Sequence, residues 1–267
     1  MAGSSRLSGP KRSYYDRRGR KLRALSEDHQ FSFACDQCGR CCHGADISLN
    51  PYDILKISDY YGITTREFLE DFTRWAVASE SGIPIVFLKA EPSCPFNREG
   101  LCNVYQIRPF LCRSYPVIRI VTYNPSEDEV NVKYSLGKNC STIKTKKTQT
   151  IREWLTSQCG DVYLQESLRW SEFKVRLAAS MYPKGDPVFH RLFYNIVYAL
   201  ELPEDEIKVL EISEVSSPEE RFRAMLKFVS ELDWEDFVEK AKADGVLIRM
   251  EHRAGLAGPS KSSLPLH

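Results

Sequence analysis

The chain has 267 residues, 42% of them hydrophobic and 27% charged, a balance that is typical of a globular protein with a sizeable core. The formal net charge of +1 argues against a general electrostatic affinity for nucleic acid or acidic membranes. Because no apolar run reaches membrane-spanning length and the N-terminus lacks the pattern of a secretory signal, we expect a cytoplasmic protein. In that reducing compartment, bound metal explains nine cysteines better than disulfides do.

The first 28 residues are rich in Gly, Ser and basic side chains and show no hydrophobic period. This composition predicts a disordered basic arm over 1–28, in preference to an arm that binds an acidic partner. The packed region is expected to begin where Phe31 and Phe33 alternate with small residues.

Four thiols lie within one short loop, which reads Cys35-Asp36-Gln37-Cys38-Gly39-Arg40-Cys41-Cys42. Thiolates are the ligands of zinc and of iron-sulfur clusters, and ligands two residues apart can wrap one metal from a tight turn. This cysteine loop therefore predicts a metal site, to which a folded domain could bring the later cysteines. The predicted metal ligands are Cys35, Cys38, Cys41, Cys42, Cys94, Cys102, Cys112 and Cys140. For Cys159 we expect a small buried side chain instead.

Two helices are predicted directly after the cysteine loop. The first starts with Asn50 as N-cap and Pro51 in the first turn, and Gly62 ends it. The second starts with a capping box formed by Thr64 and Glu67. Its buried stripe is expected to contain Phe68, Leu69, Phe72 and Trp75.

Three strands are predicted in the stretch that carries the later cysteines. The apolar run 83–88 leads directly towards Cys94. The runs 117–123 and 129–135 are rich in branched and aromatic residues and flank Asn124-Pro125-Ser126, which predicts a hairpin. These strands would bring the distant ligands back to the cysteine loop.

The rest of the chain shows helical periodicity. One helical region starts near Thr148 and is interrupted near Gly160, and a second apolar helical face covers 189–200. Ser217 begins a further helix as its N-cap, and a short final helix spans 233–245.

These elements predict an organisation in four parts. They are a disordered basic arm over 1–28, a metal-binding domain over 29–182, a helical region over 183–250 and a flexible tail over 251–267. The predicted fold class is α+β, mainly helical, with a small antiparallel sheet built around a cysteine-rich metal site.

The cysteine spacing favours a 4Fe-4S cluster over zinc. Cys-x-x-Cys-x-x-Cys followed by a remote Cys94-Pro95 is similar to the arrangement of bacterial ferredoxins. Zinc stays the alternative, because eight cysteines could form two four-thiolate sites. The side chains of adjacent residues such as Cys41 and Cys42 generally diverge, so one of these two is expected to serve a second metal or to support the ligands.

Two arginines bracket one predicted ligand in the sequence Arg108-Pro109-Phe110-Leu111-Cys112-Arg113. A thiolate-rich site carries excess negative charge. Arg108 and Arg113 are therefore candidate cofactor-binding residues, which could neutralise the site and donate hydrogen bonds to its sulfurs. Surface ion pairs are the alternative for both. His43 is expected to support the ligands or to face solvent, since thiols are already abundant.

Together these motifs resemble the CxxCxxCC, or YkgJ-type, family of zinc- or iron-chelating proteins. The resemblance covers roughly residues 33 to 142 and uses many separated positions. It rests on the cysteine loop and on Cys94-Pro95-Phe96, Cys102-Asn103-Val104-Tyr105, Arg108-Pro109-x-x-Cys112-Arg113-x-Tyr115-Pro116 and Cys140. The resemblance implies a metal-chelating role and a relation to the flagellin lysine N-methylases, whose similar cysteine motif is linked to an iron-sulfur cluster.

Two function classes follow from this reading. The first is a protein that carries a metal or a cluster and acts in electron transfer, in metal handling or as a stable scaffold. In electron transfer it would bind a redox partner. The alternative, implied by the resemblance, is a cluster-dependent protein-lysine N-methyltransferase that uses S-adenosylmethionine on a protein substrate. No Gly-x-Gly-x-x-Gly turn follows a predicted strand, and the cysteine spacing differs from that of radical enzymes, so no catalytic residue is assigned. The balanced charge of the metal-bearing region argues against a zinc-ribbon nucleic-acid binder.

Overall fold

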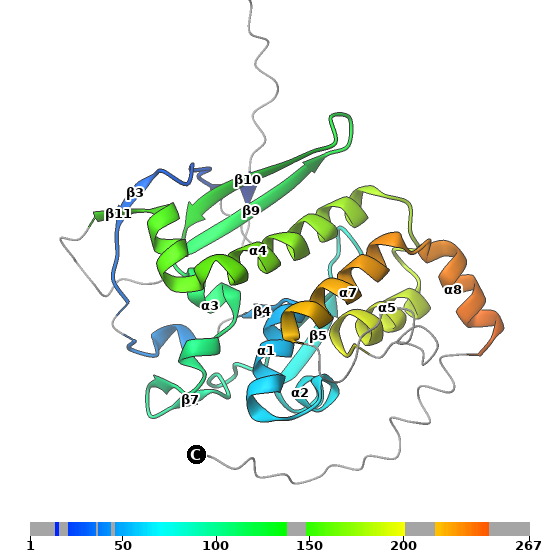
Figure 1. Cartoon of the computed structure of the whole chain (residues 1–267), viewed down its shortest axis with the longest axis horizontal. Coiled ribbons are helices and arrows are strands. Elements are labelled where there is room, and N and C mark those ends of the chain that lie inside the picture. The colour runs from blue at the N-terminus through cyan, green and yellow to red at the C-terminus, as the bar shows by residue number, and fades with distance from the viewer. Residues whose placement is uncertain are drawn as a thin grey trace, which may run out of the picture.

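The computed structural model describes residues 14–15, 21–35, 37–43, 46–137, 148–200 and 217–245. Helices and small antiparallel sheets occur together, as the predicted α+β class requires (Figure 1). The helices are α1 (Pro51–Tyr61), α2 (Thr65–Phe72), α3 (Phe110–Ser114), α4 (Ile151–Ala179), α5 (Pro187–Phe193), α7 (Pro218–Glu231) and α8 (Trp234–Ala243). Short 3-10 turns lie at Arg40–Cys42 and Tyr105–Ile107, and a π-helical turn lies at Tyr194–Tyr198.

The strands form several small sheets where the sequence predicted one. β6 (Pro84–Leu88) lies between β4 (Ser48–Leu49) and β5 (Thr73–Val77). β9 (Val117–Asn124) and β10 (Glu129–Leu136) pair as a hairpin. Shorter pairs join β3 (Gln30–Ser32) to β11 (Thr148–Thr150), β7 (Asn97–Arg98) to β8 (Leu101–Cys102) and β1 (Tyr14–Tyr15) to β2 (Lys21–Leu22). The strand predicted at 83–88 and the later hairpin are confirmed.

Side-chain caps define α1 and α2 as predicted. Asn50 and Asp53 form a capping box at the start of α1, and Gly62 ends the helix in the left-handed region with φ 64°. Thr64 and Glu67 form the capping box of α2. The buried residues of α2 are Phe68 and Leu69.

The prediction for Trp75 is wrong. α2 ends at Phe72, because Thr73 turns to extended backbone and pairs with Leu88 of β6. Trp75 therefore lies on β5 and is 42% exposed. Its ring packs against Tyr194, with the two ring centroids 5.3 Å apart.

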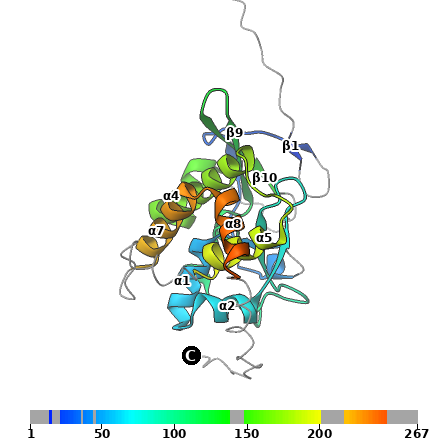
Figure 2. The ribbon, with the colours of Figure 1, turned by 90° about the vertical axis from the view of Figure 1, so that its right-hand side faces the viewer.

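α4 crosses the molecule beneath the β9–β10 hairpin, with α1 and α2 on its other side (Figures 1 and 2). Thr150 and Glu153 form its capping box. Gly160, with φ 69°, kinks the helix at the interruption that the periodicity predicted. α3 packs on α4, where the Trp154 indole N–H donates a hydrogen bond of 3.0 Å to the Ser114 carbonyl.

One hydrophobic core extends from the cysteine-bearing segment into the last described helices. Trp170 of α4 lies against Phe193 and Tyr198. Trp234 of α8 packs on Phe189 and Phe193, with ring centroids 5.1 and 5.5 Å apart. Residues on both sides of the boundary predicted near residue 182 therefore share one core.

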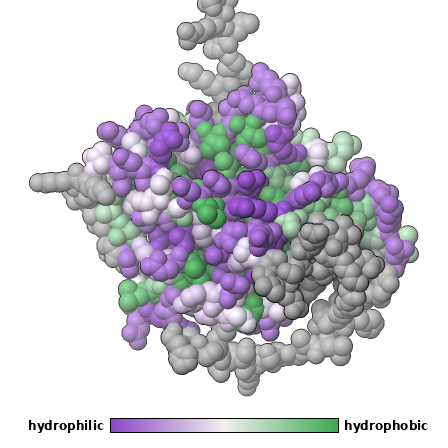
Figure 3. Space-filling view, in the orientation of Figure 1, coloured by the Kyte–Doolittle hydropathy of each residue, from purple (hydrophilic) through white to green (hydrophobic). Residues whose placement is uncertain are grey.

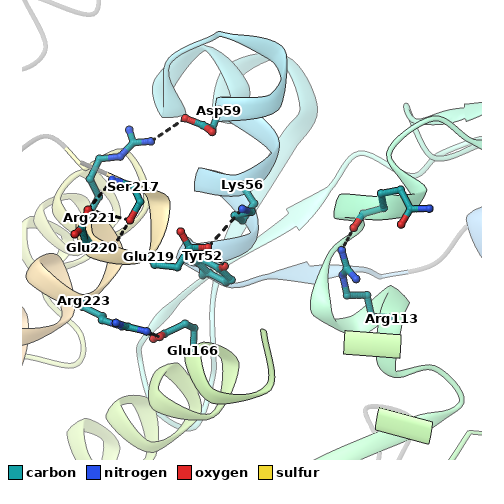
Figure 4. Close-up of polar contacts among 11 residues, drawn as sticks. Tyr52, Lys56, Asp59, Arg113, Glu166, Ser217, Glu219, Glu220, Arg221 and Arg223 are labelled. Atoms are coloured by element: carbon teal, nitrogen blue, oxygen red, sulfur yellow. Dashed lines mark hydrogen bonds and ion pairs between the residues drawn. The ribbon is translucent and has the colours of Figure 1, made fainter. Parts of the chain in front are cut away.

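Polar contacts hold α7 against α1 and α4 (Figure 4). The Tyr52 hydroxyl of α1 donates a hydrogen bond to Glu219 of α7. Arg223 of α7 donates two hydrogen bonds to the buried Glu166 of α4, at 2.7 Å from Nε and 2.5 Å from Nη2. These four residues are called the α7 seam below. Beside them the Phe222 ring packs against Tyr52, with centroids 5.7 Å apart.

The packed region begins earlier than predicted. Leu25 is buried, its N–H donates to the Tyr134 carbonyl at 2.8 Å, and its carbonyl accepts the Tyr134 N–H at 3.0 Å. Most of the predicted basic arm before residue 21 lies outside the described residues, and so does the predicted tail over 251–267.

The surface is largely hydrophilic on the face shown in Figure 3, where hydrophobic side chains form small, separate areas of the described surface. Each helix in the described part of the chain is too short or too polar to cross a lipid bilayer.

Candidate metal centre

The cysteine loop turns sharply at Gly39. Gly39 has φ 68°, in the left-handed region, and its carbonyl accepts the Cys42 N–H at 2.9 Å. The resulting turn carries both Cys41 and Cys42. A Cβ at Gly39 would lie only 2.8 Å from the carbonyl oxygen of Gly100, so the cysteine loop and the β7–β8 turn approach each other through two glycines.

Cys94 and Cys102 belong to one hairpin unit around β7 and β8. The Cys94 carbonyl accepts the Asn97 N–H at 3.0 Å, and Asn97 pairs with Cys102 across the hairpin. The Asn97 side chain also accepts the Gly100 N–H at 3.0 Å, which holds the turn. Asn97 was not among the predicted site residues, although an Asn three residues before a Gly is a recognisable turn signal. His43 lies beside it, with Nε2 3.5 Å from the Asn97 side-chain nitrogen.

A backbone contact joins the cysteine loop to this hairpin. The Cys94 N–H donates a hydrogen bond of 2.7 Å to the Cys42 carbonyl. Cys112, on α3, lies within electrostatic range of Cys41, Cys94 and Cys102. The structure thus brings together five thiols from three separate segments of the chain. They are Cys41, Cys42, Cys94, Cys102 and Cys112, and are called the thiol group below.

Members of the thiol group raise the pKa values of one another. A hydrogen bond with Cys41 raises the pKa of Cys42, and burial and the nearby Cys94 and Cys102 raise it further. Burial raises the pKa of Cys112 well above its usual value, with added contributions from the neighbouring thiols. Burial is also the main reason why the pKa values of Cys94 and Cys102 are raised. Because ionised thiols repel one another at close range, this donor set fits a soft cation such as zinc or iron, which would replace the protons.

The thiol group is not arranged as a complete coordination sphere. Within the described ranges, no three His, Cys, Asp or Glu side chains form a group that could hold a metal ion as placed. The predicted fold class included a cysteine-rich metal site. The structure shows neighbouring thiols at this place, but they do not have metal-binding geometry. No disulfide joins any two of the eight described cysteines.

The other predicted cysteines differ in exposure. Cys35 and Cys38 are exposed in the cysteine loop. Cys140 falls in 138–147, outside the described residues. Cys159 is buried on α4, as expected for a small core side chain, and burial raises its pKa to about 11.

Arg108 and Arg113 fix the segment that leads into α3 against α4. Arg108 donates to the Gln158 side-chain oxygen at 2.8 Å, and its guanidinium lies 3.8 Å from the centre of the Tyr105 ring. Arg113 donates to the Arg108 carbonyl at 2.8 Å and to the Gln158 carbonyl at 3.1 Å. The charge of Arg108 lowers the pKa of Cys102, against the larger effect of burial. Arg108 thus lies within electrostatic range of the thiol group, and a role of either arginine towards a cofactor stays a prediction.

Comparison with known proteins identifies the cysteine-bearing segment. Residues 34–160 match the model of the CxxCxxCC family, described as "Putative zinc- or iron-chelating domain". Neither a curated protein nor a solved structure matches the chain. The matched segment contains the cysteine loop, the β7–β8 hairpin and α3, which together supply the thiol group. Residues 34–160 of this chain are therefore similar to the zinc- or iron-chelating domains that this family model describes.

Proposed function

We propose that this protein chelates iron or zinc through thiolates gathered from the cysteine loop, the β7–β8 hairpin and α3. The observation that carries the proposal is the backbone contact between Cys94 and Cys42, which joins two cysteine-bearing segments while Cys112 lies within electrostatic range of Cys94. Thiolates held this closely repel one another, and a bound cation removes that repulsion. The proposed ligands are drawn from Cys35, Cys38, Cys41, Cys42, Cys94, Cys102, Cys112 and Cys140.

The bound group that we propose is a 4Fe-4S cluster, with zinc as the alternative. The support is the spacing of Cys35, Cys38 and Cys41 together with the remote Cys94-Pro95. When bound, such a cluster supplies one-electron transfer, whereas zinc supplies a structural cross-link. The chain itself positions the thiols that would bind this group and shields them from water. The thiols that are at least partly withdrawn from solvent are Cys42, Cys94, Cys102 and Cys112.

Elemental analysis of the full chain, purified without oxygen, tests this proposal. A 4Fe-4S cluster predicts brown protein with broad absorption near ~400 nm and about four irons and four sulfides per chain. Colourless protein with stoichiometric zinc would decide for the alternative metal. Protein that binds neither, after separate reconstitution with iron and sulfide and with Zn²⁺, would contradict chelation itself.

The protein-lysine N-methyltransferase alternative is carried by the family resemblance and needs its own test. If it holds, labelled S-adenosylmethionine incubated with metal-loaded protein and candidate protein substrates should label lysine. No label, together with no calorimetric binding of the methyl donor, would remove this alternative and leave a metal or cluster carrier in electron transfer, metal handling or a stable scaffold.

A further inference from the structure

We propose that Asp53 is a positioning residue for the thiol group: its carboxylate fixes the start of α3 and thereby sets where Cys112 lies. This inference rests on the proposed function, because it assigns Asp53 a role towards the same ligands. Asp53 lies in the first turn of α1 and is only 1% exposed. It is not among the predicted ligands, and it acts through the backbone of α3.

The two carboxylate oxygens of Asp53 serve the starts of two different helices. Oδ2 accepts the Asn50 N–H at 3.0 Å, which completes the capping box of α1. Oδ1 accepts, at 2.8 Å, the N–H of Phe110, the first residue of α3. A carboxylate suits both positions, because a helix N-terminus presents unpaired N–H groups and partial positive charge. One buried side chain therefore joins the N-terminal ends of α1 and α3.

Three other capping boxes in the described helices show what is particular about Asp53. Glu67, Glu153 and Glu220 also accept the N–H of their own N-cap residue, and all three of these hydrogen bonds are exposed. A cap therefore does not require burial. Burial of Asp53 raises its pKa to about 6, against the lowering effect of the two amide donors, so the buried position costs free energy. The hydrogen bond from Phe110 gives the buried carboxylate a second role in addition to capping α1.

α3 depends on such links because it has only five residues, far fewer than an isolated helix needs to be stable. Its C-terminal end is held by α4, where Trp154 donates to the Ser114 carbonyl. Its N-terminal end is held by Asp53, next to the turn in which the Cys112 N–H donates to the Pro109 carbonyl at 2.9 Å. Losing the Asp53 link would loosen the turn that carries Cys112 while the α4 side stays fixed.

The test replaces Asp53→Asn in the full chain, with Asp59→Asn as the matched control. Asp59 lies on the same helix, but it is exposed and pairs with Arg221 at 3.3 Å. Mass spectrometry follows the alkylation of Cys112 and Cys159 in metal-free protein, and competition with a chelator measures the affinity for Zn²⁺. For Asp53→Asn we expect Cys112 alkylation to be faster and Zn²⁺ binding to be weaker, each by about tenfold, as for other residues that orient metal ligands.

The alkylation rate of Cys159 distinguishes a positioning role of Asp53 from general unfolding, because Cys159 is buried on α4. In Asp53→Asn it should react at the wild-type rate, and Asp59→Asn should match the wild type throughout. Unchanged Cys112 reactivity and Zn²⁺ affinity in Asp53→Asn would overturn the proposal. Equal acceleration at Cys112 and Cys159 would overturn it too, since it would show a loss of overall stability alone.

A second pair of variants decides the matter if Asp53→Asn does not fold. Phe110→Pro and Phe110→Ala both lose the ring, but only proline lacks the N–H that Asp53 accepts, and the first helical position tolerates proline. Faster Cys112 alkylation in the proline variant supports the proposal, and equal rates overturn it. A wild-type chain that binds neither Zn²⁺ nor, after reconstitution, iron and sulfide would count against the proposed function alone, because Cys112 reactivity in metal-free protein still tests Asp53.

Discussion

The Cys94 N–H donates a hydrogen bond of 2.7 Å to the Cys42 carbonyl, so the cysteine loop and the β7–β8 hairpin are joined through the backbones of two cysteines. A backbone hydrogen bond does not depend on the ionisation of either thiol, whereas the thiols themselves repel one another as anions. The chain therefore gathers its donor atoms through contacts that need no thiolate.

Gly39→Ala should separate the cysteine loop from the hairpin. Alanine is strained at φ 68°, and its Cβ would lie 2.8 Å from the Gly100 carbonyl oxygen. We expect a loss of about 1–3 kcal/mol in the free energy of unfolding, together with most of the bound metal. Gly62→Ala is the control, because it has φ 64° but no described heavy atom within 4 Å of a Cβ. Denaturant unfolding and metal analysis compare the two, and equal metal content in both variants would contradict the prediction.

Cys94→Ala should remove metal, and Cys159→Ala should not. The two cysteines are matched in burial, at 7% and 8% exposed, so each substitution removes a similarly buried sulfur. Each should cost roughly 1 kcal/mol of unfolding free energy in metal-free protein. Metal content per chain should fall only in Cys94→Ala. Equal metal loss in the two variants would show that the ligand assignment is wrong.

Metal binding should release protons. Because the pKa values of Cys42, Cys94, Cys102 and Cys112 are raised, these thiols are protonated at pH 7 in metal-free protein, and protons compete with the metal. We expect release of about three to four protons per Zn²⁺ at a four-thiolate site, and an affinity that weakens as the pH falls. Calorimetry in two buffers with different ionisation enthalpies counts the protons. A count near zero would exclude thiol ligands.

Arg223→Met should destabilise the α7 seam. It leaves Glu166, which is 0% exposed, with Arg169 Nε at 3.5 Å as a weaker partner. We expect a loss of about 2 kcal/mol in the free energy of unfolding, because a buried carboxylate loses the guanidinium that donates two hydrogen bonds to its Oε1. Lys240→Met, which breaks an exposed pair with Asp236 on α8, should leave the free energy of unfolding close to the wild-type value. Urea unfolding measures both, and similar small losses would show that the seam contributes little.

The helix starts could be predicted from sequence because a cap is a local structure. Asn50, Thr64 and Ser217 were predicted as N-caps, and each one accepts a hydrogen bond from the residue three positions later. Trp75 could not be placed in the same way. Its strand is defined by pairing with Val86, a residue of a different segment, and this pairing overrides the helical pattern.

The candidate site could be predicted as a set of residues but not as a geometry. Cysteine spacing indicates which side chains to consider, and the family match to 34–160 agrees with it. Which thiols lie closest depends on contacts that have no local pattern, such as the approach of Gly39 to Gly100. Asp53 is the clearest case, because its first hydrogen bond belongs to a visible cap and its second, to Phe110, is a tertiary contact.

The α7 seam also bears on how the chain can be truncated to a shorter fragment. The family segment ends at residue 160, at the kink of α4, so Tyr52 falls inside it while Glu166 and Glu219 fall outside. A fragment limited to 34–160 would keep its cysteines, yet Tyr52 would lose Glu219 and the apolar surface that Phe222 covers would face water. Surfaces of this kind promote self-association. The apolar surface of the thiol-bearing segment is therefore covered by a helix that lies beyond the residues matched by the family model.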